Sequence, residues 1–326
     1  GRCPEGVEMK NLITCLVVCV MSGVVTADKA QRGSAYPLED GQIIANNYSN
    51  LQRYGSPCSV APWNGVNCSN WIHETPMATS IGYVAVDSQG LPLLFNAYST
   101  NRSVYRFNGI DIEFLFQLPH EPQSQPTVLG DFIYYTYHTN ERSLYKANII
   151  TGEVVLVTGN INYGDLASDG VNLFTMQHVI KGNCCWECPV VRYSQIWTVN
   201  SETGDLESLV CNWMNSCGTV GDARLFTCCK GYFHVIHHDR LMLVDPSPVN
   251  SIVYAGEYCD EDDLSSLSSM QTSGSYSPDL DCSGDVGVDD LLILIGKWGG
   301  TFGPADLNKD GHVNVHDLLI LIGDWA

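Results

Sequence analysis

Basic residues are scarce in this chain of 326 residues, which has 16 lysines and arginines against 36 aspartates and glutamates, a formal net charge of −20. Nucleic-acid surfaces need clustered positive charge, so this balance argues against a nucleic-acid partner. Long apolar runs are also lacking, because no segment after residue 27 approaches the roughly 20 apolar residues that span a bilayer. Hydrophobic residues still make up 44% of the chain, enough for packed cores.

Recognisable catalytic motifs are missing too. The sequence has no Gly-x-Ser-x-Gly, no His-Glu-x-x-His and no phosphate-binding loop. On an extended strand His234 and His238 share one face and His237 takes the other, which disfavours one metal held by all three. Two acidic pairs lie in turn-like segments, at Asp165 with Asp169 and at Glu202 with Asp205. A few aromatic residues are candidates for a sugar-binding surface, namely Tyr134, Tyr135, Tyr137, Trp186 and Trp213. Packing in the core or anchoring of loops is the favoured explanation for them.

The N-terminal segment has the composition of a secretory signal peptide. Residues 1–8 are interpreted as upstream sequence, Lys10 supplies a positive charge, and residues 12–25 are mostly apolar. Val25 and Ala27 suit the small-residue positions of a cleavage site before residue 28. The apolar stretch is shorter than a membrane span. We therefore expect residues 1–27 to be removed and the mature chain to be secreted, as an extracellular protein of bacterial type.

Cysteine usage agrees with an exported chain. Eleven of the 14 cysteines follow residue 27, and seven of them fall between residues 184 and 229. Such a cluster predicts disulfides, and Cys58 and Cys68 bracket a short loop that they could close. Because eleven is an odd number, at least one cysteine is expected to be free or paired with another chain. The alternative is a zinc site formed by Cys185, Cys188 and either Cys228 or Cys229. It is disfavoured because no histidine and no second Cys-x-x-Cys lies at the spacing of a zinc finger.

An acidic segment of twelve residues is duplicated near the C-terminus. Residues 279–290 precede LLILIGKWG, and residues 306–317, shifted by 27, precede LLILIGDWA. A calcium ion takes six to eight oxygens, which such a loop supplies from positions 1, 3, 5, 7, 9 and 12. The expected ligands of the first loop are Asp279, Asp281, Ser283, the carbonyl of Asp285, and Asp290. Those of the second are Asp306, Asn308, Asp310, the carbonyl of His312, and Asp317, with Asn314 acting through water.

Other positions of the two loops fit the same interpretation. Gly284 and Gly311 occupy position 6, where the chain turns sharply. Val286 and Val313 at position 8 are expected to pair with each other. The alternative is an acidic turn that merely caps a helix, but two complete copies favour two calcium ions. The helices are expected to form the core of the module through Leu291, Leu292, Ile295, Trp298, Leu318, Leu319, Ile322 and Trp325.

The duplication resembles the type I dockerin domain over residues 277–326. The similarity lies in the doubled loop, aspartate at position 12, the LLILIG helix and the absence of an amphipathic helix before either loop. It implies a small all-α module of paired loop–helix, EF-hand-like units that binds calcium and a cohesin-like protein, often beside polysaccharide-degrading enzymes. Positions 10 and 11, Val288-Asp289 and Val315-His316, differ from the Ser-Thr-like pair of the best-known dockerins.

Residues 80–256 predict strands throughout, in a unit that recurs every 40 to 52 residues. Tyr105, Tyr145, Trp197 and Met242 hold matching places in successive strand–turn–strand units. This period is typical of β-propeller blades, and the chain resembles exported propellers with NHL- or PQQ-like repeats. A β-sandwich is the alternative fold. The expected preceding strands are Leu93–Tyr98, Phe132–His138, Leu173–His178 and Tyr232–His237. A further strand is expected upstream of these in a unit, such as Ile81–Val86 or Tyr163–Ala167.

The expected fold is therefore mainly β, with a propeller of four to five blades over residues 28–256. An acidic, serine-rich linker over 257–278 and a dockerin-like module over 279–326 follow. The expected function is attachment to a cohesin-like or cell-surface protein, with the propeller as a recognition or display domain. The alternative is an extracellular polysaccharide hydrolase or lyase whose site lies on the propeller, which makes a polysaccharide a second candidate partner.

Overall fold

The computed structural model covers most of the chain between residues 38 and 325. It describes residues 38, 43–46, 50–54, 71–76, 81–96, 102–138, 141–181, 191–214, 224–229, 232–237, 240–245, 251–257, 266–269, 276–281, 283 and 285–325. The expected signal peptide, the loop between Cys58 and Cys68, and Cys185 and Cys188 lie outside these residues. None of the helices described is long and apolar enough to cross a membrane.

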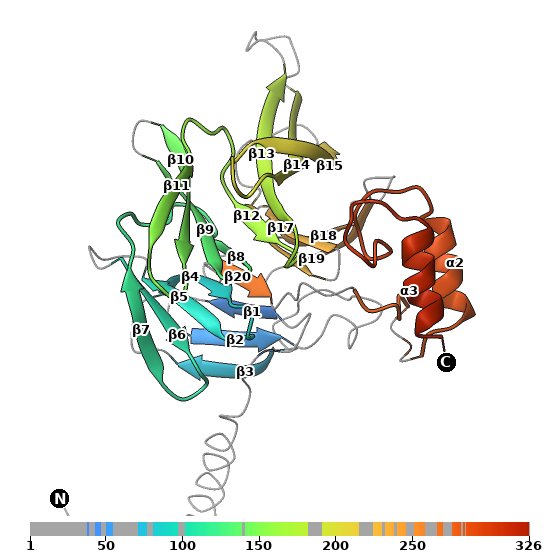
Figure 1. The fold of residues 1–326 in the computed structure, drawn as a ribbon, viewed down its shortest axis with the longest axis horizontal. Helices are drawn as coiled ribbons and strands as arrows, with labels where there is room; N and C mark the ends of the chain where they lie inside the picture. The colour runs from blue at the N-terminus through green and yellow to red at the C-terminus, as the bar shows by residue number, and fades with distance from the viewer. Residues whose placement is uncertain are drawn as a thin grey trace, which may run out of the picture.

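Five four-stranded antiparallel sheets make up the β part of the described chain (Figure 1). Four of them follow the order of the sequence. They consist of β4 (Ile81–Val86), β5 (Pro92–Asn96), β6 (Ser103–Phe107) and β7 (Ile112–Gln117); β8 (Thr127–Leu129), β9 (Phe132–His138), β10 (Arg142–Asn148) and β11 (Val154–Thr158); β12 (Leu166–Ser168), β13 (Leu173–Lys181), β14 (Val191–Val199) and β15 (Leu206–Met214); and β16 (Arg224–Cys229), β17 (Tyr232–His237), β18 (Arg240–Asp245) and β19 (Ser251–Glu257).

The fifth sheet joins the two ends of the β region. Its strand order is β20 (Ser266–Ser269), β1 (Ile43–Asn46), β2 (Asn50–Tyr54) and β3 (Trp71–Pro76). Residues 43–76 thus supply three strands of a blade that the sequence left unplaced. The segment interpreted as a linker contains β20, so part of it belongs to the β domain. The serine-rich composition of this segment did not predict a strand, because few of its residues are β-branched or aromatic.

Each of the five sheets has one edge strand on the inside of the domain. These inner strands contact one another in a closed ring, in the order β4, β8, β12, β16 and β20. Burial follows this arrangement, since β4 is almost fully buried and β7 at the outer edge is mostly exposed. Core clusters fill the spaces between neighbouring sheets. Sheets radiating from a ring of inner strands are the blades of a propeller, which confirms the mainly β, propeller-like fold.

The recurring aromatic position marks the third strand of each blade. Tyr105, Tyr145 and Trp197 lie on β6, β10 and β14, and the register against the outer strand shifts beside each of them. Met242 lies at the matching place on β18. A bulge bends a strand and increases its twist. The repeat in the sequence therefore records the position where each of these blades twists.

Glycine turns close the outer hairpins. The Asn148 and Asn200 side chains each accept two backbone N–H groups of the turn, and the N–H groups of Gly152 and Gly204 return to the carbonyls of these asparagines. Both glycines have positive φ, 72° and 75°. Gly204 also accepts a hydrogen bond from the Tyr163 hydroxyl, at 2.9 Å. The tip of one blade thus contacts the preceding blade.

Gly204→Ala should destabilise the propeller strongly. A Cβ at this position would overlap the Cγ2 atom of Thr158, and its φ of +75° is unfavourable for alanine. Strain and overlap together should lower the free energy of unfolding by about 3 kcal/mol, measured by urea denaturation. Gly130→Ala is the matched control, because φ is +59° but the space is open, and it should cost only about 1 kcal/mol. Equal losses in the two variants would contradict the contact argument.

Two helices follow the propeller, α2 (Val288–Gly296) and α3 (Val315–Gly323), which lie side by side at the right of Figure 1. Their core differs from the expected one. Leu294 and Leu321 are fully buried, with Leu291 and Leu318 partly buried beside them. The remaining residues expected in the core are exposed by 39–60%, at Leu292, Ile295, Trp298, Leu319, Ile322 and Trp325.

The short β-bridge expected between Val286 and Val313 is replaced by another backbone pairing, although Val286 packs against the core cluster that contains Val313. The backbone of Val313 bonds instead to Gly299 and Gly300, with two N···O distances of 2.9 Å. The segment that connects α2 to the second acidic loop therefore pairs with the centre of that loop. The turn formed by Gly299 and Gly300 brings the two together, and Gly299 has a φ of +76°.

Candidate metal centre

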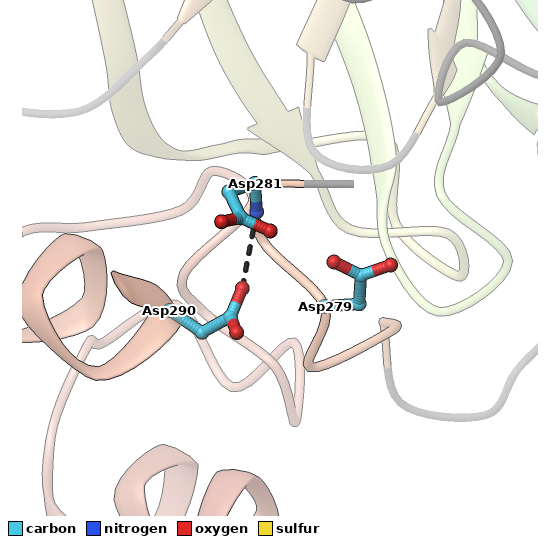
Figure 2. A group of neighbouring side chains, drawn as sticks. All are labelled: Asp279, Asp281 and Asp290. Carbon is cyan, nitrogen blue, oxygen red and sulfur yellow. Dashed lines mark hydrogen bonds between the residues drawn. The ribbon is translucent and has the colours of Figure 1, made fainter. Parts of the chain in front are cut away.

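The first acidic loop turns three carboxylates toward one another at the start of α2. One oxygen each from Asp279, Asp281 and Asp290 lies within 4.8 Å of the other two. Figure 2 shows these three side chains and the hydrogen bond between Asp290 and the backbone of Asp281. Asp290 is 1% exposed and accepts the backbone N–H groups of Leu280, Asp281 and Gly287 at 2.7–3.1 Å. These bonds fasten position 12 to the loop, so the helix begins with its carboxylate facing the centre.

The second loop repeats this framework at α3. Asp317 is fully buried and accepts the N–H groups of Asn308 and Asn314 at 3.2 and 2.7 Å. Asp306, 1% exposed, accepts those of Asp310 and Gly311 at 3.1 and 2.9 Å. Gly311 at position 6 has a φ of +87°, as the sharp turn requires.

Electrostatics differ between the loops. Burial, together with the neighbouring charges of Asp317 and Asp310, raises the pKa of Asp306 to about 7, against the opposing backbone hydrogen bonds from Gly311 and Asp310. In the exposed first loop, hydrogen bonding with Ser283 lowers the pKa of Asp281. Carboxylates crowded without a counter-charge repel each other, and a bound cation would remove that repulsion.

The donor set fits a hard cation. Carboxylate, amide and carbonyl oxygens are the ligands that calcium takes, and both loops present them around position 12. Ser283, Asp285 and His312 are exposed, and Asp285 and His312 were expected to contribute only their carbonyls. These two carbonyls now accept hydrogen bonds from Ser283 and Asn314, at 3.1 and 2.9 Å. In the second loop Asn308 donates to Asp310 at 2.8 Å, so its amide would have to reorient to offer oxygen.

Six apolar side chains that the sequence predicted in the core of the module instead form an exposed apolar surface, on α2 and α3 and just beyond their ends. It consists of three pairs related by the 27-residue shift, Leu292 with Leu319, Ile295 with Ile322, and Trp298 with Trp325. The position-12 carboxylates face the loops, which fixes the rotation of each helix and turns Leu294 and Leu321, one turn later, into the core. The three pairs therefore lie on the solvent side. The sequence shows only the four-residue spacing from Asp290 to Leu294 and from Asp317 to Leu321, which identifies the buried face once the carboxylate is seen to bond to the loop.

The other candidates are engaged in structural contacts. Glu202 accepts from Lys146 at 2.6 Å, and Asp205 accepts from the Thr203 hydroxyl at 2.7 Å. Asp165 accepts the backbone N–H of Gln125 at 3.4 Å, and Asp169 accepts those of Val171 and Asn172 in its own turn. Tyr134 and Tyr135 are buried, whereas Tyr137 stacks on His120 with ring centroids 4.4 Å apart. The side chains of several other candidates lie outside the described part, namely His234, His237, His238, Trp186 and Trp213.

No protein-family model and no curated protein matches the chain. Among solved structures, a chain of the nidogen/laminin complex is similar with a TM-score of 0.43 and 9% identity, over 71% of this chain and 98% of that one. TolB from Acinetobacter baumannii gives 0.42 and 10%, over 71% and 67%. BamB from Moraxella catarrhalis gives 0.29 and 13%, over 74% and 63%. These scores are low, so the propeller assignment rests on the ring of sheets.

Proposed function

We propose that this chain is a secreted protein that binds two calcium ions and uses its C-terminal dockerin-like module to attach noncovalently to a protein partner. The observation that carries the proposal is the duplicated loop, in which Asp290 and Asp317 are both buried and bonded to the loop backbone, and Asp290 lies close to Asp279 and Asp281. Each loop places several negative charges around one centre. Calcium would neutralise them and hold the loop against its helix.

The apolar surface of α2 and α3 supports attachment. Leu292 and Ile295 of α2 and Leu319 and Ile322 of α3 are exposed, and so are the tryptophans just beyond the helix ends, Trp298 at 49% and Trp325 at 39%. Aromatic and aliphatic side chains gathered on one exposed face are typical of protein interfaces. The partner that we propose is a cohesin-like or cell-surface protein. The propeller would then act as the recognition or display domain.

The alternative is a polysaccharide hydrolase or lyase. A glycosidase needs two carboxylates across a cleft, whereas the acidic pairs on the propeller are held in turns and ion pairs. The attachment function is therefore favoured. Incubation of the chain with plant and algal glycans tests the alternative directly, since release of products would require a catalytic site.

Calcium titration by calorimetry should give two ions per chain. Asp290→Asn and Asp317→Asn should each remove one site, because each substitution takes away the position-12 carboxylate. Asp285→Asn is the matched control, since it makes the same charge change in the first loop but its expected ligand is the carbonyl. This variant should keep both sites. No calcium uptake by the unsubstituted chain, or loss of a site in the control, would contradict the proposal.

A further inference from the structure

The second loop contacts the propeller through Lys309, at position 4. This side chain is only 4% exposed, and its Nζ atom donates to the backbone carbonyl of Asp169 at 2.7 Å. The ammonium also lies 4.4 Å from the centroid of the Tyr276 ring. From the other side, Asn172 donates from Nδ2 to the Lys309 carbonyl at 3.2 Å. The loop is thus bonded to the turn between β12 and β13.

Phe302 makes a second contact between the same two parts. Its ring meets Phe174 of β13 edge to face, with centroids 5.8 Å apart, and Phe174 meets Phe233 of β17 in the same way at 5.0 Å. The tip of the Phe302 ring also lies against Gly311, where an added Cβ would be 3.1 Å from the ring. One aromatic ring therefore contacts both the core between two blades and the position-6 glycine of the loop.

Backbone conformation indicates that these contacts are specific. Phe302 and Lys309 have φ values of 43° and 60°, a region that non-glycine residues adopt at a cost of about 1–2 kcal/mol. Such conformations persist where surrounding contacts hold them. Both of these residues contact the propeller or Tyr276, and both flank Asp306. The contacts with the propeller therefore help to hold this part of the loop in place.

The duplication in the sequence breaks at the same two residues. The 27-residue shift carries Asp306 and Asp317 onto Asp279 and Asp290, so the ligand positions are kept. It carries Lys309 onto a cysteine and Phe302 onto a serine, at positions 282 and 275. The first loop lacks both side chains that contact the blade. The two loops share their ligands but not their attachment to the propeller.

We propose that contact with the propeller makes the two calcium sites unequal, with the second loop held in its binding conformation and its occupancy coupled to the turn at Asp169–Asn172. This inference rests on the proposed calcium binding. A loop that is already ordered loses less conformational entropy when the ion binds, so its affinity is higher. Coupling is reciprocal, so calcium in the second loop must also strengthen the contact with the blade.

Calorimetry on the full chain in two single-site backgrounds tests the proposal. Asp290→Asn leaves the second loop to bind calcium, and Asp317→Asn leaves the first. The second loop should bind about tenfold more tightly, within the usual range of coupling. Phe302→Ala should remove most of that difference and leave the affinity of the first loop unchanged. Phe114→Ala, which truncates an exposed phenylalanine on β7, is the matched control and should change neither affinity.

A second pair of variants separates docking from charge and from misfolding. Asn172→Ala breaks the link from the propeller side without altering the module, and it should also weaken the second site. Lys309→Met removes a positive charge, which by itself would strengthen cation binding, so a weaker second site would indicate lost docking. Equal affinities in the two backgrounds, or no effect of Phe302→Ala and Asn172→Ala, would overturn the inference while leaving calcium binding intact.

Hydrogen exchange supplies the reciprocal measurement. Calcium should slow amide exchange around the β12–β13 turn in the unsubstituted chain and in Asp290→Asn, but not in Asp317→Asn or Phe302→Ala. Unchanged exchange at the turn on calcium addition would overturn the coupling. Absence of calcium uptake at both loops would instead remove the proposed function, and this inference with it.

Discussion

Chelation of calcium should unfold α2 and α3 while the strands of the five blades stay folded. The module has a small core, formed mainly by Leu294, Leu307, Val313 and Leu321, and each loop carries buried carboxylates that need a counter-charge. At free calcium 100 times the dissociation constant, one site stabilises the folded state by about 2.7 kcal/mol. Amide protection in residues 288–323 should therefore fall about 100-fold or more after chelation, measured by hydrogen exchange of the full chain.

The control for this result is a chain that no longer responds to calcium. The double variant Asp290→Asn with Asp317→Asn should show weak protection of both helices with and without the ion. Strands such as β9 and β10, which pair along their whole length in the propeller, serve as the internal reference in every sample. Helices that stay protected in excess chelator would show that the apolar core alone holds the module, contrary to the expectation.

Leu321→Ala should unfold the module even in saturating calcium. The side chain is fully buried between the helices, and removing a buried leucine costs about 2–5 kcal/mol from lost transfer energy and the cavity left behind. So small a module has little stability to lose. Leu319→Ala is the matched control two residues away, because Leu319 is 60% exposed, and its helix should keep its protection. Thermal unfolding monitored by calorimetry distinguishes the two.

The Leu319→Ala variant can also be used to test attachment to a partner. Leu319→Ala and Leu292→Ala together truncate two exposed leucines without touching Leu294 or Leu321. The double variant should remain folded and bind two calcium ions, but capture less of a calcium-dependent partner from the proteins that the source organism secretes. Capture equal to that of the unsubstituted chain would place the interface elsewhere.

Local patterns predicted much of the fold. The strands expected at Ile81–Val86, Phe132–His138 and Tyr232–His237 have the observed bounds, because each is a short run of apolar and aromatic residues between turn signals. The turns that end at Gly152 and Gly204 are local in the same way, since each needs a residue that adopts positive φ. The range of four to five blades included the fifth, but its strands could not be placed, because it pairs strands from opposite ends of the β region and Ser266–Ser269 has no strand-like composition.

The loops were predictable because calcium ligation fixes residue type and spacing within twelve residues, so Asp279, Asp290, Asp306 and Asp317 were found from the sequence alone. The sequence by itself also determined the duplication and the acidic excess, since residues 257–326 hold 14 acidic and 2 basic residues. Only the tertiary structure decided which helix face is buried, because helical phase depends on where the position-12 carboxylate bonds. It likewise decided that Lys309 and Phe302 meet the propeller, since contacts between residues more than 120 positions apart depend on how the chain folds, which local spacing does not record.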